Sequence, residues 1–499
     1  ALRLAFRFPN LVQDDARQHV FWMARFRDPT LFPNDLIADY FQAVAPNGYS
    51  AFYLLFAQLG LEPLWLSKLL PAILGVATAW IAFLFFRLLL ADSRAAFAGT
   101  VLLTQLLWLD DDIISATPRA FAVGLLLAFL YFALRRKWIA CVVVLAVQAV
   151  VYPQTAFLST AILGVRLIHS RTRTDYVVFA ASLFLLGAVV FPFASSSAPY
   201  GPVVTRSDAL ALPEFQEGGR SEFFVRPISF WLNHSRSGLF PDDIPLHFLL
   251  LAVGGIWLCL RNRNGQVSPL LSLGLAALLM WSAAHLFLFR LHLPGRYSHW
   301  PVRILVVVAA AFFLGRALAR VRFRAVLLTL LIIVLVPHFT HELPNDSYVR
   351  GKPRELLAFL RTQPKDITIA MLSPDAGAIP VFAQRSVLVS AEHAIPYHTR
   401  YYRELRERGR DLLLAHLTSD PVELRKLIEK RGIDLFILQR VPITSDQLKR
   451  LAWYKDIAPP ELLGISDQQS ALRAFAPRCT IWEDGDWLVL DARVIADGI

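Results

Sequence analysis

The sequence predicts a polytopic α-helical membrane bundle with a soluble α/β domain at its C-terminal end. Apolar residues make up 56% of the 499 residues and charged residues 18%, whereas soluble domains average about 45–50% and about 25%. The mean hydropathy is +0.47. Long apolar runs fill the region 62–340, and frequent charges follow it. These observations exclude an ordinary soluble protein and predict a membrane domain over residues 1–342 and a soluble domain over residues 343–499.

Ten apolar stretches are candidate spans, because a spanning helix needs about 20 mostly apolar residues. They lie near 62–88, 95–109, 119–134, 138–152, 155–168, 176–193, 246–260, 268–289, 301–315 and 325–340. The region 138–168 could instead be one broken hairpin that bends at "YPQT", and residues 49–60 predict an interfacial or re-entrant helix. The chain begins with "ALRLAFRFP", which we expect to be the end of one further span upstream of residue 1, not a signal peptide.

Basic residues gather in every second turn between these stretches, which predicts the orientation of the bundle. The basic turns hold Arg87 with Arg94, "RRK" (135–137), "RLIHSRTR" (166–173), "RNRNG" (261–265) and "RALARVRFR" (316–324). By the positive-inside rule these turns face the cytoplasm. The first outer loop (9–61), the long outer loop (194–245) and everything after 340 then face the other side. The net charge of +11 belongs to this pattern, and we expect no nucleic-acid partner.

The region after 343 alternates short apolar runs with charged helical segments, which indicates a small α/β domain. Strands are expected at 366–372, 386–390 and 432–438, followed by a hairpin at 479–491 that turns at Asp484-Gly485. Helices are expected at "PRELLAFLRTQ", "YYRELRERGRDLLLAH" and "PVELRKLIEKRG", the last ending at Gly432.

Two acidic clusters lie on the predicted outer side. The first-loop motif "QDDARQH" (13–19) has two interpretations: Asp14 or Asp15 caps a helix, or Asp15 and His19, one helical turn apart, form a metal-ligand or acid–base pair. The acidic turn, Asp110–Asp112, ends an apolar stretch. Three adjacent carboxylates raise the pKa of at least one of them unless a cation lies near. The acidic turn could hold a divalent cation (Mg²⁺ or Mn²⁺), supply a general base, or be a solvated span end.

The late loop, residues 290–303, is basic on the side where the positive-inside rule disfavours basic residues. It holds Arg290, His292, Arg296, His299 and Arg303. Arginine binds phosphate through two parallel hydrogen bonds, so this loop predicts a lipid-phosphate site. The alternative is an interfacial anchor with Tyr297 and Trp300. In the soluble domain, a polar cluster could contact an acceptor or be an ordinary surface loop; its members are Glu392, His393, Tyr397, His398 and Arg400.

These motifs resemble, in their order and placement, the GT-C class of membrane glycosyltransferases. "QDDARQH" stands where that class has an acidic motif in its first outer loop, "LDDD" resembles its acidic second outer loop, and "LPGRY" its late-loop arginine. "FPNDLIADYFQAVAPNGY" (32–49) would be the amphipathic, membrane-parallel segment of the first loop. The resemblance covers about residues 1–340. The first helix of the class would correspond to the span that we expect upstream of residue 1.

The resemblance implies a glycosyltransferase that uses a polyprenyl-phosphate-linked sugar at the outer face of a bacterial inner (plasma) membrane, among membrane lipids. Asp14 or Asp15 would deprotonate an acceptor hydroxyl, which attacks the anomeric carbon with inversion. Arg296, with Arg290 or Arg303, would stabilise the leaving phosphate. The acidic turn would orient the acceptor or hold a metal. The acceptor could be a glycan, a lipid or a protein. A flippase or transporter, a lipid-linked oligosaccharide ligase or polymerase, and a non-catalytic scaffold are the alternatives.

Overall fold

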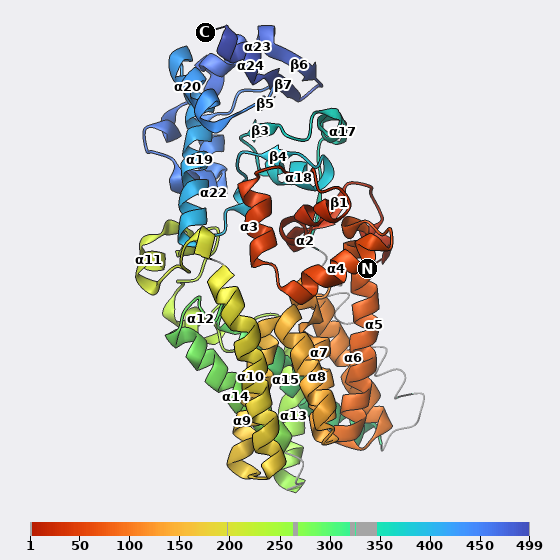
Figure 1. Cartoon of the computed structure of the whole chain (residues 1–499). Helices are drawn as coiled ribbons and strands as arrows, with labels where there is room; N and C mark the ends of the chain where they lie inside the picture. The colour runs from red at the N-terminus through yellow and green to blue at the C-terminus, as the bar shows by residue number, and fades with distance from the viewer. Residues whose placement is uncertain (1, 197, 263–267, 320–324, 326–346, 499) are drawn as a thin grey trace.

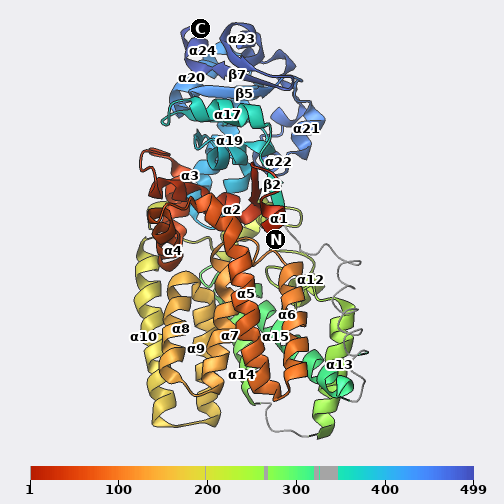
Figure 2. The same cartoon turned by 90° about the vertical axis from the view of Figure 1, so that its right-hand side faces the viewer.

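The computed structural model describes residues 2–196, 198–262, 268–319, 325 and 347–498. Figures 1 and 2 show a long molecule in which a bundle of helices forms one half and the C-terminal part of the chain forms the opposite end. The N-terminal segment lies between these two parts in both views.

Helices occupy nine of the ten candidate spans, and the tenth, 325–340, lies outside the described residues apart from residue 325. They are α5 (Pro63–Leu90), α6 (Ser93–Leu109), α7 (Ala122–Leu134), α8 (Trp138–Val151), α9 (Pro153–His169), α10 (Arg173–Ser196), α13 (Leu246–Asn262), α14 (Ser268–Leu286) and α15 (Gly295–Leu318). The region 138–168 therefore forms two helices. The second begins at Pro153, a residue suited to the first position of a helix because its missing N–H needs no partner there.

The prediction of ten spans is confirmed only in part. Four described helices are long and apolar enough to cross a membrane: Pro63–Leu90, Arg173–Pro192, Pro269–Leu286 and Gly295–Ala317. The other helices in the candidate ranges have 13 to 17 residues. At 1.5 Å per residue they reach about 20–26 Å, less than the roughly 30 Å of bilayer hydrocarbon. The apolar composition correctly predicted where these helices lie, but the chain turns before they reach the length of a full span.

Close helix contacts hold the bundle together. Leu102, Leu126 and Ile304 are fully buried in a shared apolar core of the bundle. Helices α13 and α15 approach so closely at Gly255 that a Cβ there would lie 1.9 Å from the Ala309 carbonyl oxygen. Glycine permits this contact because it has no side chain. Helix α15, which carries the late loop at its start, is thereby fixed in the bundle.

The C-terminal part contains the expected strands in one five-stranded sheet. Its order is β4 (Ser386–Val387), β3 (Thr368–Met371), β5 (Leu435–Gln439), β7 (Trp487–Asp491) and β6 (Thr480–Glu483). Strands β4, β3 and β5 are parallel, and the hairpin β6–β7 joins β5 antiparallel. The expected helices are α17 (Arg354–Thr362), α19 (Thr399–Leu417) and α20 (Pro421–Arg431). Gly432 ends α20 in the left-handed conformation, at φ +59°.

The N-terminal segment packs with the C-terminal part of the chain. Strand β1 (Leu11–Gln13) pairs antiparallel with β2 (Tyr348–Arg350). The short helices that follow are α2 (Asp14–His19), η1 (Phe21–Phe26), α3 (Leu36–Val44) and α4 (Asn47–Gln58). Val12, Trp22 and Phe41 share one hydrophobic cluster with Ile369 and Phe436 of the sheet region. The first-loop motif is therefore held in place by residues more than 300 positions away.

The segment 32–49 differs from the membrane-parallel helix that the resemblance implies. The apolar face of α3 is buried against protein, and the Tyr40 ring stacks on Tyr401 with centroids 3.6 Å apart. The exposed apolar side chains belong instead to α4 and its end, where Leu55 is 54% and Leu59 is 73% exposed. Helix α4 confirms the short helix expected at 49–60, and its position at a membrane interface stays a prediction.

Candidate active site

The first-loop motif starts a helix, but neither aspartate caps it. The side-chain oxygen of Gln13 accepts hydrogen bonds from the backbone N–H groups of Asp15 and Ala16, at 2.9 and 3.2 Å. The side-chain nitrogen of Gln13 donates to Asp111 at 3.4 Å. One amide therefore caps α2 and reaches the acidic turn. Asp14 and Asp15 are left free of the capping role.

The expected pair of Asp15 and His19 is not formed as a hydrogen bond in the described part of the chain. The His19 ring lies edge-on to Phe41, with centroids 5.6 Å apart. Asp15 is ion-paired with Arg119 instead. An arginine fork makes a stronger partner for a carboxylate than a neutral imidazole does.

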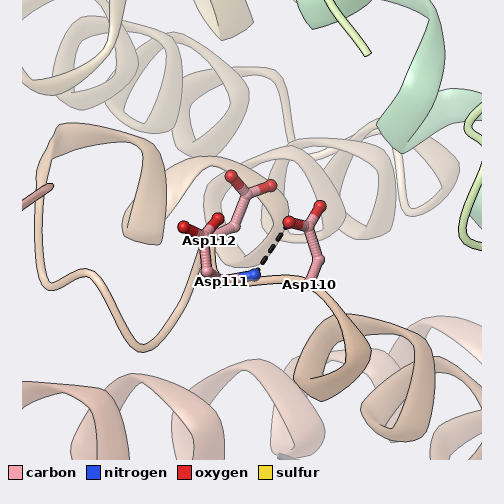
Figure 3. Close-up of side chains that lie close together, drawn as sticks. All are labelled: Asp110, Asp111 and Asp112. Atoms are coloured by element: carbon pink, nitrogen blue, oxygen red, sulfur yellow. Dashed lines mark hydrogen bonds between the residues drawn. The ribbon is translucent and has the colours of Figure 1, made fainter. Parts of the chain in front are cut away.

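The acidic turn directly follows α6 and presents its three carboxylates on the same side, as Figure 3 shows. The backbone N–H of Asp111 donates to Asp110 at 2.8 Å. Asp112 is the buried member, 3% exposed, and accepts a hydrogen bond from Trp300 Nε1 at 2.7 Å. Tyr49 and Tyr53 of α4 donate their hydroxyls to the Ala116 carbonyl. The first loop thus supports the turn.

Arg119 joins the two acidic clusters and is not among the residues singled out from the sequence. Besides Asp15, its guanidinium contacts Asp111 at 2.8 Å and Asp112 at 3.2 Å. It lies in the short helix η2 (Pro118–Phe121), next to the acidic turn, and its side chain is 13% exposed. The available signal was the repulsion among three adjacent carboxylates, which requires a nearby cation. The first arginine after them in the sequence is Arg119.

The structure brings two of the three candidate phosphate-binding arginines to the acidic turn. Arg303 is 5% exposed and contacts Asp110 and Asp243 at 2.7 Å each and Asp112 at 3.9 Å. Arg296 contacts Asp112 at 3.3 Å and keeps 26% of its side chain exposed. Arg290 is exposed, and no ion pair of its side chain is found among the described residues. Arg296 is therefore the member that is both in the cluster and accessible.

Glu392 of the C-terminal part contacts the first-loop motif directly. It accepts from Arg17 at 2.6 Å, from the Gln18 amide, and lies 3.3 Å from Arg220 of the long loop. Arg17 also pairs with Asp14. Glu392 is 11% exposed, so its carboxylate is engaged with protein groups. Arg17 and Arg220 were not singled out from the sequence.

The other polar residues of this cluster have protein partners as well. His393 is fully buried and its Nδ1 lies 2.7 Å from the Ser390 hydroxyl. The Tyr397 hydroxyl accepts from Arg236 at 3.0 Å, and His398 Nδ1 lies 2.9 Å from the Tyr40 hydroxyl. A role for these residues in contacting an acceptor stays a prediction.

The ionisation of the site carboxylates differs because their surroundings differ. Burial disfavours the charged form of Asp15, but Arg119 and the neighbouring cations outweigh burial and lower the pKa of Asp15. Burial together with the charges of Asp15, Asp110 and Asp112 outweighs Arg119 at Asp111 and raises the pKa of Asp111 to about 6. Burial also raises the pKa of Glu392 and lowers the pKa of His19.

The acidic turn does not fit a divalent cation as it stands. One oxygen from each of Asp110, Asp111 and Asp112 lies within 4.8 Å of the others, a spacing that could suit a metal. Each of the six oxygens, however, already faces a nitrogen donor at 2.7–3.4 Å. Arginines supply three of these six contacts, and their charge opposes a metal ion at the same place.

No family model and no curated protein matches this sequence. Solved structures do match. An oligosaccharyltransferase from Archaeoglobus fulgidus, crystallised with a tethered acceptor peptide, is similar with a TM-score of 0.52 and 13% identity, over 91% of this chain and 68% of that chain. The arabinofuranosyltransferase AftD from Mycobacteria is similar with a TM-score of 0.52 and 17% identity, over 88% of this chain and 36% of that chain.

ArnT from Cupriavidus metallidurans, in complex with undecaprenyl phosphate, matches with a TM-score of 0.39 and 12% identity, over 96% of this chain and 94% of that chain. The oligosaccharyltransferase and AftD are GT-C glycosyltransferases. The chain therefore has the GT-C fold, as predicted from its sequence motifs. At these identities the likeness establishes the fold alone.

Proposed function

We propose that this chain is a membrane glycosyltransferase that moves a sugar from a polyprenyl-phosphate donor to an acceptor hydroxyl on the non-cytoplasmic face. The observation that carries the proposal is the meeting of the first-loop motif, the acidic turn and the late loop at one end of an apolar bundle, through Arg119 and Arg296. The GT-C fold supports the same class of reaction. The sugar and the acceptor class are left open.

In the proposed reaction, Asp15 accepts the proton of the acceptor hydroxyl. The oxygen then attacks the anomeric carbon, and the bond between that carbon and the phosphate oxygen breaks, with inversion. Asp15 can take this role because its side chain is 30% exposed and its lowered pKa leaves it ionised, although the lowering also makes it a weaker base than a free aspartate. Asp14 pairs with Arg17, and no contact of Asp14 with the acidic turn or with Arg119 is found among the described residues, so it is the weaker candidate.

Arg296 stabilises the leaving lipid phosphate in this proposal. Among the described residues its side chain pairs with one carboxylate, that of Asp112, and it is the more exposed of the two late-loop arginines beside the acidic turn. A guanidinium neutralises phosphate charge as it develops, which lowers the barrier to departure. Arg303 has three carboxylate neighbours and holds the acidic turn in place.

The test is transfer of a labelled sugar from a polyprenyl-phosphate donor by the purified chain in lipid vesicles, with a mixture of glycan, lipid and peptide acceptors. Asp15→Asn is expected to lower turnover by about 10²–10⁴-fold, the usual contribution of a general base. Asp39→Asn is the matched control, because Asp39 is also a partly exposed first-loop aspartate paired with an arginine. Full activity in both Asp14→Asn and Asp15→Asn would contradict the assignment. Movement of the donor across the membrane without a new glycosidic bond would indicate a flippase.

A further inference from the structure

We propose that Arg119 is the resident cation of this site: it supplies the positive charge that holds Asp15, Asp111 and Asp112 together, so sugar transfer needs no divalent metal ion. The part concerning transfer rests on the proposed function. The exclusion of metal ions rests on the ion pairs alone and can be tested separately.

The contacts of Arg119 are those that a bridging cation would make. One terminal nitrogen pairs with Asp15 of the first loop and lies 2.8 Å from Asp111, while the other lies 3.2 Å from Asp112. These carboxylates belong to two segments that are about a hundred residues apart in the chain. A planar guanidinium with five N–H donors can serve three carboxylates at once, which an ammonium cannot do in the same directions.

The remaining oxygens of the acidic turn leave no free set for a metal. Arg303 contacts Asp110, Trp300 donates to Asp112, and the Gln13 amide donates to Asp111. Mg²⁺ requires about six oxygen ligands at 2.0–2.1 Å in a near-octahedral arrangement. To satisfy it, the carboxylates would have to release these donors and place the metal beside the guanidinium of Arg119.

The position of Arg119 is fixed by the fold. It follows the acidic turn at the start of η2, and the intervening Ala116 carbonyl is held by the hydroxyls of Tyr49 and Tyr53. Ser115 and Thr117 beside it are buried and hydrogen-bonded to each other at 2.8 Å. The Arg119 guanidinium therefore belongs to the same segment as Asp111 and Asp112, and Asp15 is its partner from the first loop.

The experiment measures Mn²⁺ binding by electron paramagnetic resonance and sugar transfer after EDTA treatment, on the full chain in vesicles. The wild-type chain is expected to bind no Mn²⁺ at the acidic turn and to keep its transfer rate within about twofold in EDTA. Arg119→Ala removes the cation shared by three carboxylates; it is expected to bind Mn²⁺ and to lose transfer by about 10²–10³-fold. Arg94→Ala is the control; Arg94 is an exposed arginine at the start of α6, whose other end leads into the acidic turn.

Two results would overturn the proposal. One is Mn²⁺ binding to the wild-type chain that Asp112→Asn removes. The other is loss of transfer in EDTA that Mg²⁺ or Mn²⁺ restores. If Arg119→Ala does not fold, Arg119→Lys keeps the charge, and it must exclude Mn²⁺ in the same way. If no sugar transfer is found with any chain, the proposed function fails, while the Mn²⁺ measurements still decide whether Arg119 keeps metal ions out.

Discussion

Glu392→Ala tests whether the C-terminal part of the chain holds the first-loop motif in place. In the wild-type chain the Glu392 carboxylate contacts Arg17, Gln18 and Arg220. The substitution removes all three contacts at once. Arg17 then keeps its ion pair with Asp14. Arg220 keeps its hydrogen bonds to the backbone carbonyls of residues 391 and 392, at 3.0 and 2.9 Å.

The expected loss follows from these contacts. Breaking a buried ion pair costs about 3–5 kcal/mol when the remaining charge has no other partner. Here both arginines retain a partner, and the variant also escapes the burial cost that raises the pKa of Glu392. We therefore expect a loss of about 2 kcal/mol, the size of a charged hydrogen bond. For a cooperative unit of 150–250 residues this lowers the melting temperature by about 4–8 °C.

The assay is thermal unfolding in detergent, combined with hydrogen exchange of the α2 amides. Glu429→Ala is the matched control, because Glu429 forms an exposed pair with Arg425 one helical turn away and should cost less than about 0.5 kcal/mol. Faster exchange in α2 is expected only in Glu392→Ala. If Glu392→Ala melts no lower than Glu429→Ala and leaves α2 exchange unchanged, the coupling inferred between the two ends of the chain is wrong.

Three further predictions concern the acidic turn and its arginines. Because burial and like charges raise the pKa of Asp111 from 3.8 to about 6, its ionisation costs the folded state stability as the pH rises through that range. Asp111→Asn should therefore raise the melting temperature at pH 8 and leave it nearly unchanged at pH 4; an equal shift at both pH values would contradict this. Arg296→Ala should raise the KM for the polyprenyl-phosphate donor by about 10–100-fold, in initial-rate measurements, and Arg290→Ala should raise it by less than about twofold; equal effects of the two would refute the assignment of the phosphate contact. Arg303→Ala should lower the melting temperature more than Arg296→Ala or Arg290→Ala does, because it leaves Asp110, Asp112 and Asp243 without their shared partner. A melting temperature equal to that of Arg290→Ala would count against this.

Local sequence signals predicted most of the elements. Apolar runs located nine helices of the bundle among the described residues, and Asp484-Gly485 and Gly432 marked a hairpin and a helix end. These features depend on a few neighbouring residues. Helix lengths were harder to predict, because composition does not show where the backbone turns, and several helices are shorter than a bilayer is thick.

The sequence singled out several residues of the candidate site, but it showed neither their pairings nor the part of Arg119. The acidic clusters and the late-loop arginine were found because their charges are unusual beside apolar stretches. Arg119 was not found, since only the folded chain shows which arginine meets Asp15 and Asp111. The direct partner of Asp15 is the Arg119 guanidinium, while His19 interacts with Asp15 through its charge; the metal-ligand or acid–base role of this pair stays a prediction. Long-range contacts such as β1 with β2 leave no local signal.

The most direct test of the central claim is a cryo-electron microscopy structure of the full chain with a polyprenyl phosphate bound. We expect the phosphate to lie at the end of the bundle that carries the acidic turn, with an oxygen about 3 Å from the Arg296 guanidinium and with Arg119 still bridging Asp15 and Asp111. A phosphate bound at the opposite end of the bundle, or a metal ion in the place of the Arg119 guanidinium, would contradict it.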